Sequence, residues 1–462
     1  MDVNKLKPKA IDLFAGPGGL SLGLSLSGFD IVGAVEWDSD AGATYRHNMG
    51  DHIHIGDIKD HSPKEMEKYL KDKGSIKRKS EIILISGGPP CPGFSLIGRS
   101  KIANLIETGE WNGSDSRHAF IDDPRNQLFR EFVAYVAYFK PKFFLMENVK
   151  GMVSYKNQQE VPIITVIKKE FENLGYSVEA RVLTASEYGV PQNRQRVIFV
   201  GTKGKKQRIR YPEPIGATIS LRDALEDLPP VSSLTGESVN EKLSPLRKIG
   251  LSDKGLFIRW VRSQKTPNGN QFRNRECTLH HTRPVNPRDQ AIFPLLTSGE
   301  NSSRILYKDI YPSRLEEVEN LLPKGYELKR YKTVPPKVIG PPWGQRKSKR
   351  WLWYDSSKFG DKMRRMRGDK PAPTIVAHLA KDGYMFIHPD EDRTITVREA
   401  ARIQSFPDSY DFSAGGKNSI SSQFRQVGNA VPPLMAMVLG EQIMCALGLK
   451  ALLTVSEVYR RD

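Results

Sequence analysis

Short apolar runs alternate with helical patterns along roughly the first 200 residues of the chain. Four compact apolar runs predict strands, at residues 9–14, 30–38, 81–86 and 142–147. Apolar residues recur at helical spacing at residues 18–29 and 126–139. Such repetition of strand, helix and strand is typical of a parallel sheet covered by helices on both faces. The pattern therefore predicts an α/β domain.

The character of the chain changes after about residue 202. Residues 203–370 are richer in proline, glycine and basic residues and show weak periodicity, and residues 211–230 resemble a linker carrying one short helix. Helical patterns return at 396–406 and at 431–449, where we expect an amphipathic helix that packs on the sheet. The chain should thus contain an α/β domain, an inserted basic domain and a C-terminal helix that returns to the first domain.

The positive charge of the chain is concentrated in one segment. The net charge is +17, and residues 201–370 contain 35 lysines and arginines against 18 acidic residues, whereas the rest of the chain has 35 of each. The same segment holds four of the six tryptophans. A domain-wide basic excess favours a nucleic-acid partner over the alternative, a solvated face that only aids solubility.

Other sequence signals narrow the class of protein. No apolar run is long enough to cross a membrane, and the N-terminal apolar segment is too short for a signal peptide. Three scattered cysteines indicate a reducing compartment, which we expect to be the cytoplasm, and no disulfide framework. Cys277 lies near His280 and His281 but lacks a second pair of ligands, so we expect no metal site.

The loop after the first expected strand carries a glycine-rich turn. Gly16, Gly18 and Gly19 in the stretch DLFAGPGG allow the backbone to approach a ligand closely. Ser21 replaces the third glycine of a dinucleotide fingerprint, and no Gly-Lys-Ser/Thr of a P-loop follows. The turn alone is compatible with an ordinary loop.

Residues at the next strand ends suggest an adenosine-containing ligand. Glu36 lies 20 residues after Gly16, where an acid accepts hydrogen bonds from ribose hydroxyls. Trp37 could cover the adenine face, and Asp57 could accept a hydrogen bond from its amino group. The alternative is a turn beside a surface acid.

Two further strand ends carry candidate chemistry. Cys91 lies between prolines in SGGPPCPGFS, a rigid loop at the ligand end of the sheet, and this setting favours a reactive thiol over a buried inert one. Glu147 follows a very apolar strand, and the alternative role is a plain surface carboxylate. Arg194 and Arg196 are two residues apart and would share one face of a strand, where guanidinium groups could bind an oxygen and a carboxylate.

In this order the motifs closely resemble those of the cytosine-5 DNA methyltransferases of bacterial restriction–modification systems. The matching stretches are DLFAGPGGLSLG, EWD, GDI, GGPPCPGFS, ENV, PQNRQRV, REAARIQSFPD and RQVGNAVPP. The resemblance implies a Rossmann-like α/β fold with a mixed, mostly parallel sheet and a smaller inserted target-recognition domain. The catalytic, cofactor-binding domain would comprise residues 1–202 and 425–462, the smaller domain with its hinge segments residues 203–424, and the variable DNA-reading part residues 230–370.

The resemblance implies S-adenosylmethionine as cofactor, with S-adenosylhomocysteine as product. The cofactor contacts would come from the glycine turn, the following strand ends and the C-terminal motif, namely Asp12, Phe14, Ala15, Gly16, Gly18, Gly19, Glu36, Trp37, Asp57, Ile58, Gly88, Pro90, Leu128, Asn429 and Ala430.

The resemblance also implies the roles of four catalytic residues. Cys91 would attack C6 of cytosine, Glu147 would hydrogen-bond N3 and the amino group, and Arg196 would hold O2 with support from Arg194. The target base would be flipped out of double-stranded DNA, because it is inaccessible inside the duplex. No residue is identified as the base that removes the C5 proton.

Several finer expectations follow from the family. Ser95 could contact a phosphate and Ile97 could fill the vacated base stack, although Ile97 could equally pack on its own domain. Arg398 and Glu399 would belong to an architectural helix that attaches the recognition domain. We expect a monomer on DNA in a bacterial cytoplasm, with a cognate restriction endonuclease that acts separately.

Three alternatives differ in substrate or class. Amino-group methylation would need no nucleophile and usually places an aromatic residue after Pro-Pro, where this chain has Cys91. An RNA cytosine-5 methyltransferase could share the scaffold. A catalytically inactive DNA-binding regulator is disfavoured by the intact set of Cys91, Glu147, Arg194 and Arg196.

Overall fold

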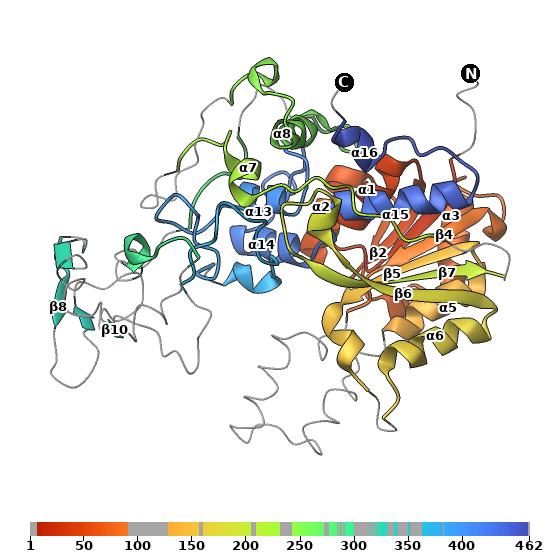
Figure 1. The fold of residues 1–462 in the computed structure, drawn as a ribbon. Helices are drawn as coiled ribbons and strands as arrows, with labels where there is room; N and C mark the ends of the chain where they lie inside the picture. Colours follow the sequence, from red (N-terminus) through yellow and green to blue (C-terminus); the bar gives the residue numbers. More distant parts are fainter. Residues whose placement is uncertain are drawn as a thin grey trace.

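A seven-stranded sheet organises the larger part of the chain. The computed structural model describes residues 7–90, 128–156, 160–204, 209–231, 243–271 and, with gaps, 277–460. The strand order is β3-β2-β1-β4-β5-β7-β6, and β7 alone runs antiparallel to the other six strands (Figure 1). The strands are β1 (Lys9–Leu13), β2 (Asp30–Glu36), β3 (Ile53–Ile55), β4 (Ile82–Gly87), β5 (Phe143–Val149), β6 (Tyr176–Thr184) and β7 (Gln195–Lys203).

Helices cover both faces of this sheet. Successive strand residues point to opposite faces, so Ala10 and Ile11 of β1 belong to two separate hydrophobic cores. The core that contains Ala10 includes side chains of α1 (Gly19–Ser27), α2 (Ser39–Met49) and α15 (Pro433–Ala446). The core that contains Ile11 includes side chains of α3 (Pro63–Asp72), α5 (Phe129–Phe139) and α6 (Ile163–Asn173).

Local sequence signals explain where several helices begin. Asp38 caps α2 by accepting the backbone N–H groups of Asp40 and Ala41. Ser62 and Glu65 form a capping box at the start of α3, where Pro63 occupies a position that needs no N–H donor.

The C-terminal helix packs tightly against the first helix. A side chain added at Gly23 of α1 would lie 2.5 Å from the Ala436 Cβ and 2.7 Å from the Met437 nitrogen of α15. Our expectation of an amphipathic helix is wrong here, because α15 is buried on nearly all sides. It contacts α1, the short helix at Ala185–Tyr188 and α16 (Val455–Val458), so it is an internal helix.

The remaining elements form a second region beside the sheet. The helices are α7 (Leu221–Leu225), α8 (Asp253–Ser263), α13 (Val397–Ile403) and α14 (Ile420–Asn429). A small sheet of β8 (Glu327–Lys329), β9 (Lys337–Ile339) and β10 (Arg350–Trp351) lies away from the main sheet (Figure 1). A separate hydrophobic cluster is centred on Ile292, Phe293, Met363 and Ile387.

Most predicted elements of the first 200 residues are present with small shifts in their ends. The expected α/β class with a mixed, mostly parallel sheet is confirmed. The short helix expected within 211–230 is α7, and the expected helix at 396–406 is the shorter α13. Among the described residues, no helix has the length and apolar character needed to span a membrane.

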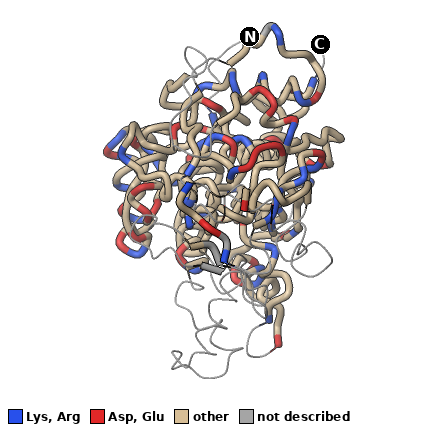
Figure 2. The backbone as a smooth tube through the Cα atoms, turned by 90° about the vertical axis from the view of Figure 1, so that its left-hand side faces the viewer, with Lys and Arg blue, Asp and Glu red and all other residues tan. Residues whose placement is uncertain are grey.

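The basic segment is only partly available to a partner. Figure 2 shows basic and acidic residues interspersed along the described backbone. Arg262 is buried and paired with Asp227 at 3.2 Å, and buried Arg365 donates to the carbonyl oxygens of Leu296 and His388. These two arginines therefore bind acidic and carbonyl groups inside the protein and do not contribute to a phosphate-binding surface.

We predict that Gly23→Ala will lower the free energy of unfolding by about 1–3 kcal/mol, because the added methyl group overpacks the contact between α1 and α15. Denaturant titration measures the change. Gly250→Ala is the matched control, since Gly250 is exposed and no atom lies within 4 Å of its added Cβ. Equal stability of the two variants would contradict the proposed tight packing.

Candidate active site

The candidate site lies where the strand order reverses. The chain proceeds from β1 toward β2 and β3 on one side and from β4 toward β5 on the other. A crevice at the carboxyl ends of the strands at such a switch point is the usual ligand site of an open α/β sheet. The loops after β1 and β4, with residues 14–19 and 88–90, meet this position.

The glycines of the turn after β1 have different structural roles. Gly16 has φ +57° and no atom within 4 Å of an added Cβ, so its exposed side is free for a ligand. An added Cβ at Gly18 would lie 2.6 Å from the Tyr410 hydroxyl oxygen, and one at Gly19 would collide with the Val431 carbonyl. Gly18 and Gly19 therefore admit the protein's own C-terminal segment.

The backbone of this turn is held in a strained form. Phe14 has φ +56°, a left-handed conformation that is unfavourable for an aromatic residue. The Ala15 N–H donates to Val35 O at 3.0 Å, and the Gly18 N–H donates to Ala15 O at 3.0 Å. Strained backbone of this kind clusters at ligand sites.

Glu36 and Trp37 border the same turn. The two carboxylate oxygens of Glu36 accept the N–H groups of Gly16 at 2.7 Å and Asp38 at 2.8 Å. Burial raises the pKa of Glu36, and these hydrogen bonds oppose the shift. The Trp37 side chain is 77% exposed, although it is large and apolar. A ligand that lay on this ring would remove that apolar surface from water.

Asp12 has an internal position. Its side chain is fully buried and accepts hydrogen bonds from the hydroxyl groups of Ser21 at 2.6 Å and Ser86 at 2.9 Å. Burial raises its pKa to about 6, and the serine hydrogen bonds act in the opposite direction. Asp12 therefore joins β1, α1 and β4 beneath the glycine turn.

Three of the predicted cofactor residues lie next to the ends of strands or helices. Asp57 accepts the Lys59 N–H at 3.0 Å, and Ile58 beside it is buried. Leu128 is partly buried and lies directly before α5.

Asn429 and Ala430 lie where α14 ends. Asn429 is exposed as the last residue of the helix, and Ala430 is buried as its C-cap.

Glu147 and Arg196 form an ion pair at the end of β5. The Arg196 Nε lies 2.9 Å from Glu147 Oε1, and both side chains are nearly buried, with 13% and 12% exposure. An added Cβ at Gly88 would lie 3.4 Å from Glu147 Oε2, so the carboxylate faces the loop after β4. Burial lowers the pKa of Arg196, and the attraction of Glu147 opposes the shift. The enclosed Glu147 Oε1 has no hydrogen-bond donor in well-aligned geometry among the described residues. Arg196 Nε, 2.9 Å away, lies off the preferred hydrogen-bond direction of this oxygen, so the contact is an ion pair.

Arg194 is fully buried behind this pair. Its Nη1 donates to the carbonyl oxygens of Ile375 at 3.0 Å and Gly428 at 3.3 Å. Burial and the charge of Arg196 lower its pKa well below its usual value. Its described contacts tie the residue before β7 to the backbone at Ile375 and to the last turn of α14, so it braces the site from behind.

The loop after β4 is anchored beside Glu147. Asn148 is buried, and its side-chain amide donates to Pro89 O at 3.0 Å. Pro90 is exposed at the end of the described segment. Cys91, Ser95 and Ile97 lie outside the described residues.

Sequence reasoning missed two buried glutamines. Gln192 and Gln404 are fully buried and hydrogen-bonded to one another, with 2.9 Å between Gln192 Nε2 and Gln404 Oε1. Both lie within motifs that we had identified, but an uncharged amide gives no sequence signal that separates a buried contact from a surface one.

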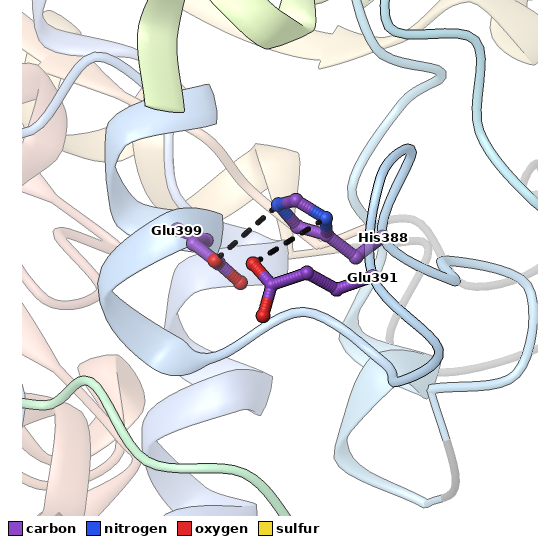
Figure 3. Close-up of side chains that lie close together, drawn as sticks. All are labelled: His388, Glu391 and Glu399. Carbon is purple, nitrogen blue, oxygen red and sulfur yellow. Dashed lines mark ion pairs between the residues drawn. The ribbon is translucent and has the colours of Figure 1, made fainter. Parts of the chain in front are cut away.

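A buried charge cluster surrounds the start of α13. His388 lies 3.7 Å from Glu391 and 3.6 Å from Glu399, in an arrangement that could hold a metal ion (Figure 3). Arg393, however, donates to both carboxylates. Its Nη2 lies 2.8 Å from Glu391 Oε1 and 2.7 Å from Glu399 Oε1, and its Nη1 lies 2.8 Å from Glu399 Oε2. Because a guanidinium already neutralises these acids, the cluster is a structural ion network.

The structure places the candidate site residues of this α/β protein at the switch point of a mixed seven-stranded sheet. Residues 8–445 match the family model of C-5 cytosine-specific DNA methylases, and the chain belongs to this family. It is therefore a DNA (cytosine-5-)-methyltransferase, a class of enzyme that uses S-adenosylmethionine.

Relatives with named functions span the same length. The chain is 31% identical to the type II methyltransferase M.AgeI of Thalassovita gelatinovora, over 95% of this chain and 100% of the relative. It is 32% identical to M.DdeI of Desulfomicrobium norvegicum, over 94% and 88% of the respective chains. An E. coli crystal structure described as a prophage-encoded DNA modification methyltransferase has the same fold, with TM-score 0.64, 24% identity and coverage of 95% of this chain and 99% of the other.

We predict that Asp12→Asn will change how stability depends on pH. Burial raises the pKa of Asp12 in the folded protein from 3.8 to about 6, so the folded state binds more protons than the unfolded state between these values. This group therefore stabilises the fold below pH 3.8, and its contribution is lost as pH rises toward 6.

Denaturant titrations at several pH values between about 4 and 7 should show the variant gaining stability relative to wild type as pH rises, by on the order of 2–3 kcal/mol. Parallel pH profiles for the two proteins would contradict this account of Asp12.

Proposed function

We propose that the chain methylates C5 of a flipped-out cytosine within a specific double-stranded DNA sequence, through a covalent bond between Cys91 and C6. The observation that carries the proposal is the Glu147–Arg196 pair, which lies beside Gly88 at the loop that leads into Cys91. The carboxylate of Glu147, whose Oε2 faces this loop, and the neighbouring guanidinium of Arg196 suit the donor and acceptor edge of cytosine.

The described residues fit S-adenosylmethionine. Gly16 leaves open space at the strained turn, Glu36 is enclosed at the end of β2, and the Trp37 ring is exposed beside it. When bound, the cofactor supplies an electrophilic methyl group on a positively charged sulfur. Glu36 would hold the ribose, Trp37 and Asp57 the adenine, and the turn at Phe14 and Gly16 the methionine end.

Each proposed catalytic side chain would act on a different part of the cytosine ring. The Cys91 thiolate adds to C6, and the C5–C6 electrons become available for attack on the methyl group. Glu147 hydrogen-bonds N3 and the amino group, and Arg196 donates to O2, so both stabilise charge that develops on the ring. Loss of the C5 proton then returns electrons to the ring and expels the Cys91 thiolate.

The division of labour between two domains is part of this proposal. Residues 1–202 and 425–462 would form the catalytic domain, and residues 203–424 the recognition domain and its hinges. The separate small core around Phe293 and Met363 and the small sheet of β8–β10 support a distinct second unit. Basic residues of this unit that are not buried would contact phosphates.

The biological role we propose is DNA modification within a restriction–modification system. The near full-length similarity to type II methyltransferases supports this role. A cognate endonuclease would act separately, and the enzyme would bind DNA as a monomer.

We predict that Glu147→Gln will slow methyl transfer by on the order of 100-fold or more, because an amide can hydrogen-bond N3 and the amino group but cannot give a proton to N3 as charge develops on the ring. The measurement is the transfer of labelled methyl groups to unmethylated phage lambda DNA. Glu172→Gln, on the exposed surface of α6, makes the same chemical change away from the site and should leave the rate unchanged.

Cys91→Ser should abolish transfer, and duplex DNA containing 5-fluorocytosine should trap wild-type protein through Cys91, because fluorine cannot leave C5 as a proton. A Cys91→Ser variant with wild-type rate would rule out the covalent mechanism.

Labelling of RNA in preference to duplex DNA would favour an RNA methyltransferase. Bisulfite sequencing of DNA from expressing cells would identify the target sequence.

A further inference from the structure

Two buried glutamines connect the base side of the site to its cofactor side. Gln192 precedes Arg194 and Arg196 by two and four residues, and it is fully buried. Its Nε2 donates to Gln404 Oε1 at 2.9 Å and to Ile403 O at 3.2 Å. The loop that presents Arg196 is therefore bonded to the end of α13.

Gln404 carries the connection onward to the end of α14. Its Nε2 donates to Val427 O at 2.6 Å and to Ala430 O at 3.3 Å. These carbonyl groups lie on both sides of Asn429, which belongs to the proposed cofactor contacts. A single side-chain amide thus fixes the two ends of the turn that presents Asn429.

A second link runs parallel to the first. The backbone N–H of Ile375 donates to Gln192 Oε1 at 2.8 Å, and Ile375 O accepts from Arg194. Arg194 also donates to Gly428 O. An added Cβ at Gly428 would lie against the backbone of Val376, so these segments are already in close contact.

We propose that the Gln192–Gln404 pair is a positioning device that couples the cytosine-binding loop to the cofactor-binding turn. This inference rests on the proposed function and adds a regulatory connection between its two half-sites. Buried amides have directional hydrogen bonds, so a change at one glutamine shifts the partner's donors and acceptors. A residue on the base side therefore sets the affinity for the cofactor, although it is placed at none of the cofactor contacts.

The test compares Gln192→Met, Gln404→Met and the double variant in the full-length protein. Methionine keeps the approximate volume and removes the hydrogen bonds, which leaves buried partners unpaired. Isothermal titration with S-adenosylhomocysteine measures the Kd. We expect each single variant to weaken binding by about 10-fold, and the double variant to be no weaker than the worse single one, because the pair acts as a unit.

Two matched controls make the same substitution nearby. Gln195 lies on β7 three residues after Gln192 and bonds Lys150 and Thr184. Gln423 is buried on α14 and donates to Asn418 O at 2.9 Å. Gln195→Met and Gln423→Met should retain wild-type Kd, which separates the pair from any general effect of losing a glutamine.

Steady-state kinetics with lambda DNA provide a second readout. Both single variants should raise the KM for S-adenosylmethionine more than they lower kcat, because the reacting groups are untouched. If Gln192→Met does not fold, Gln192→Glu replaces it, since it retains the oxygen that accepts the Ile375 N–H and removes the donor to Gln404.

The outcomes separate the two proposals. Wild-type protein that fails to bind S-adenosylhomocysteine would overturn the proposed function. Wild-type binding together with an unchanged Kd in folded Gln192→Met would overturn the coupling alone. Additive losses in the double variant would also overturn it, because independent effects require no connection between the two glutamines.

Discussion

Neutralisation of buried arginines is the constraint on which the rest of the structure depends. Arg194, Arg393, Arg398 and Arg402 are among the largest fully buried side chains. Arg402 is bound by Asp408 at 2.7 Å and by Asp227, which lies 175 residues earlier in the chain. An unpaired buried charge would cost several kcal/mol. These partners must therefore meet for the interior to close, and their meeting brings distant segments of the chain around one centre.

The need to satisfy buried guanidinium groups also distinguishes two arginines of the candidate site. Arg194 satisfies backbone carbonyl groups, whereas Arg196, two residues later, faces Glu147. The two arginines, which are two residues apart, therefore differ in role: backbone carbonyl groups hold Arg194 in the interior, and Arg196 faces the candidate site. In the glycine turn, Gly16 leaves space for a ligand while Gly18 and Gly19 leave space for the protein. Residues within one sequence motif are thus constrained by different contacts, some with a ligand and others with the protein itself.

The sequence predicted the sheet and the site better than it predicted long-range packing. The strand-end motifs pointed to Glu36 and Glu147 because carboxyl ends of parallel strands meet at one edge, a rule that needs no three-dimensional information. Arg196 was predicted instead from its spacing to Arg194. The internal position of α15 was missed, although its apolar residues surround nearly the whole helix and a helix that is apolar all round is typically buried. Gln192 bonds Gln404 and Arg402 bonds Asp227 across more than 170 residues, and spacing carries no signal over such a distance.

The packing of α14 and α15 against the start of the chain has a consequence for biosynthesis. The first helix emerges from the ribosome before Phe406 and residues 431–437, which pack closely at Gly19 and Gly23. Until those residues are synthesised, the face of α1 that packs on α15 lacks this partner, and the turn at Asn429 does not exist. A nascent or truncated chain that ends before residue 429 has all seven strands of the main sheet but lacks this packing and the turn at Asn429, so we expect methylation of DNA to begin only after the chain is nearly complete.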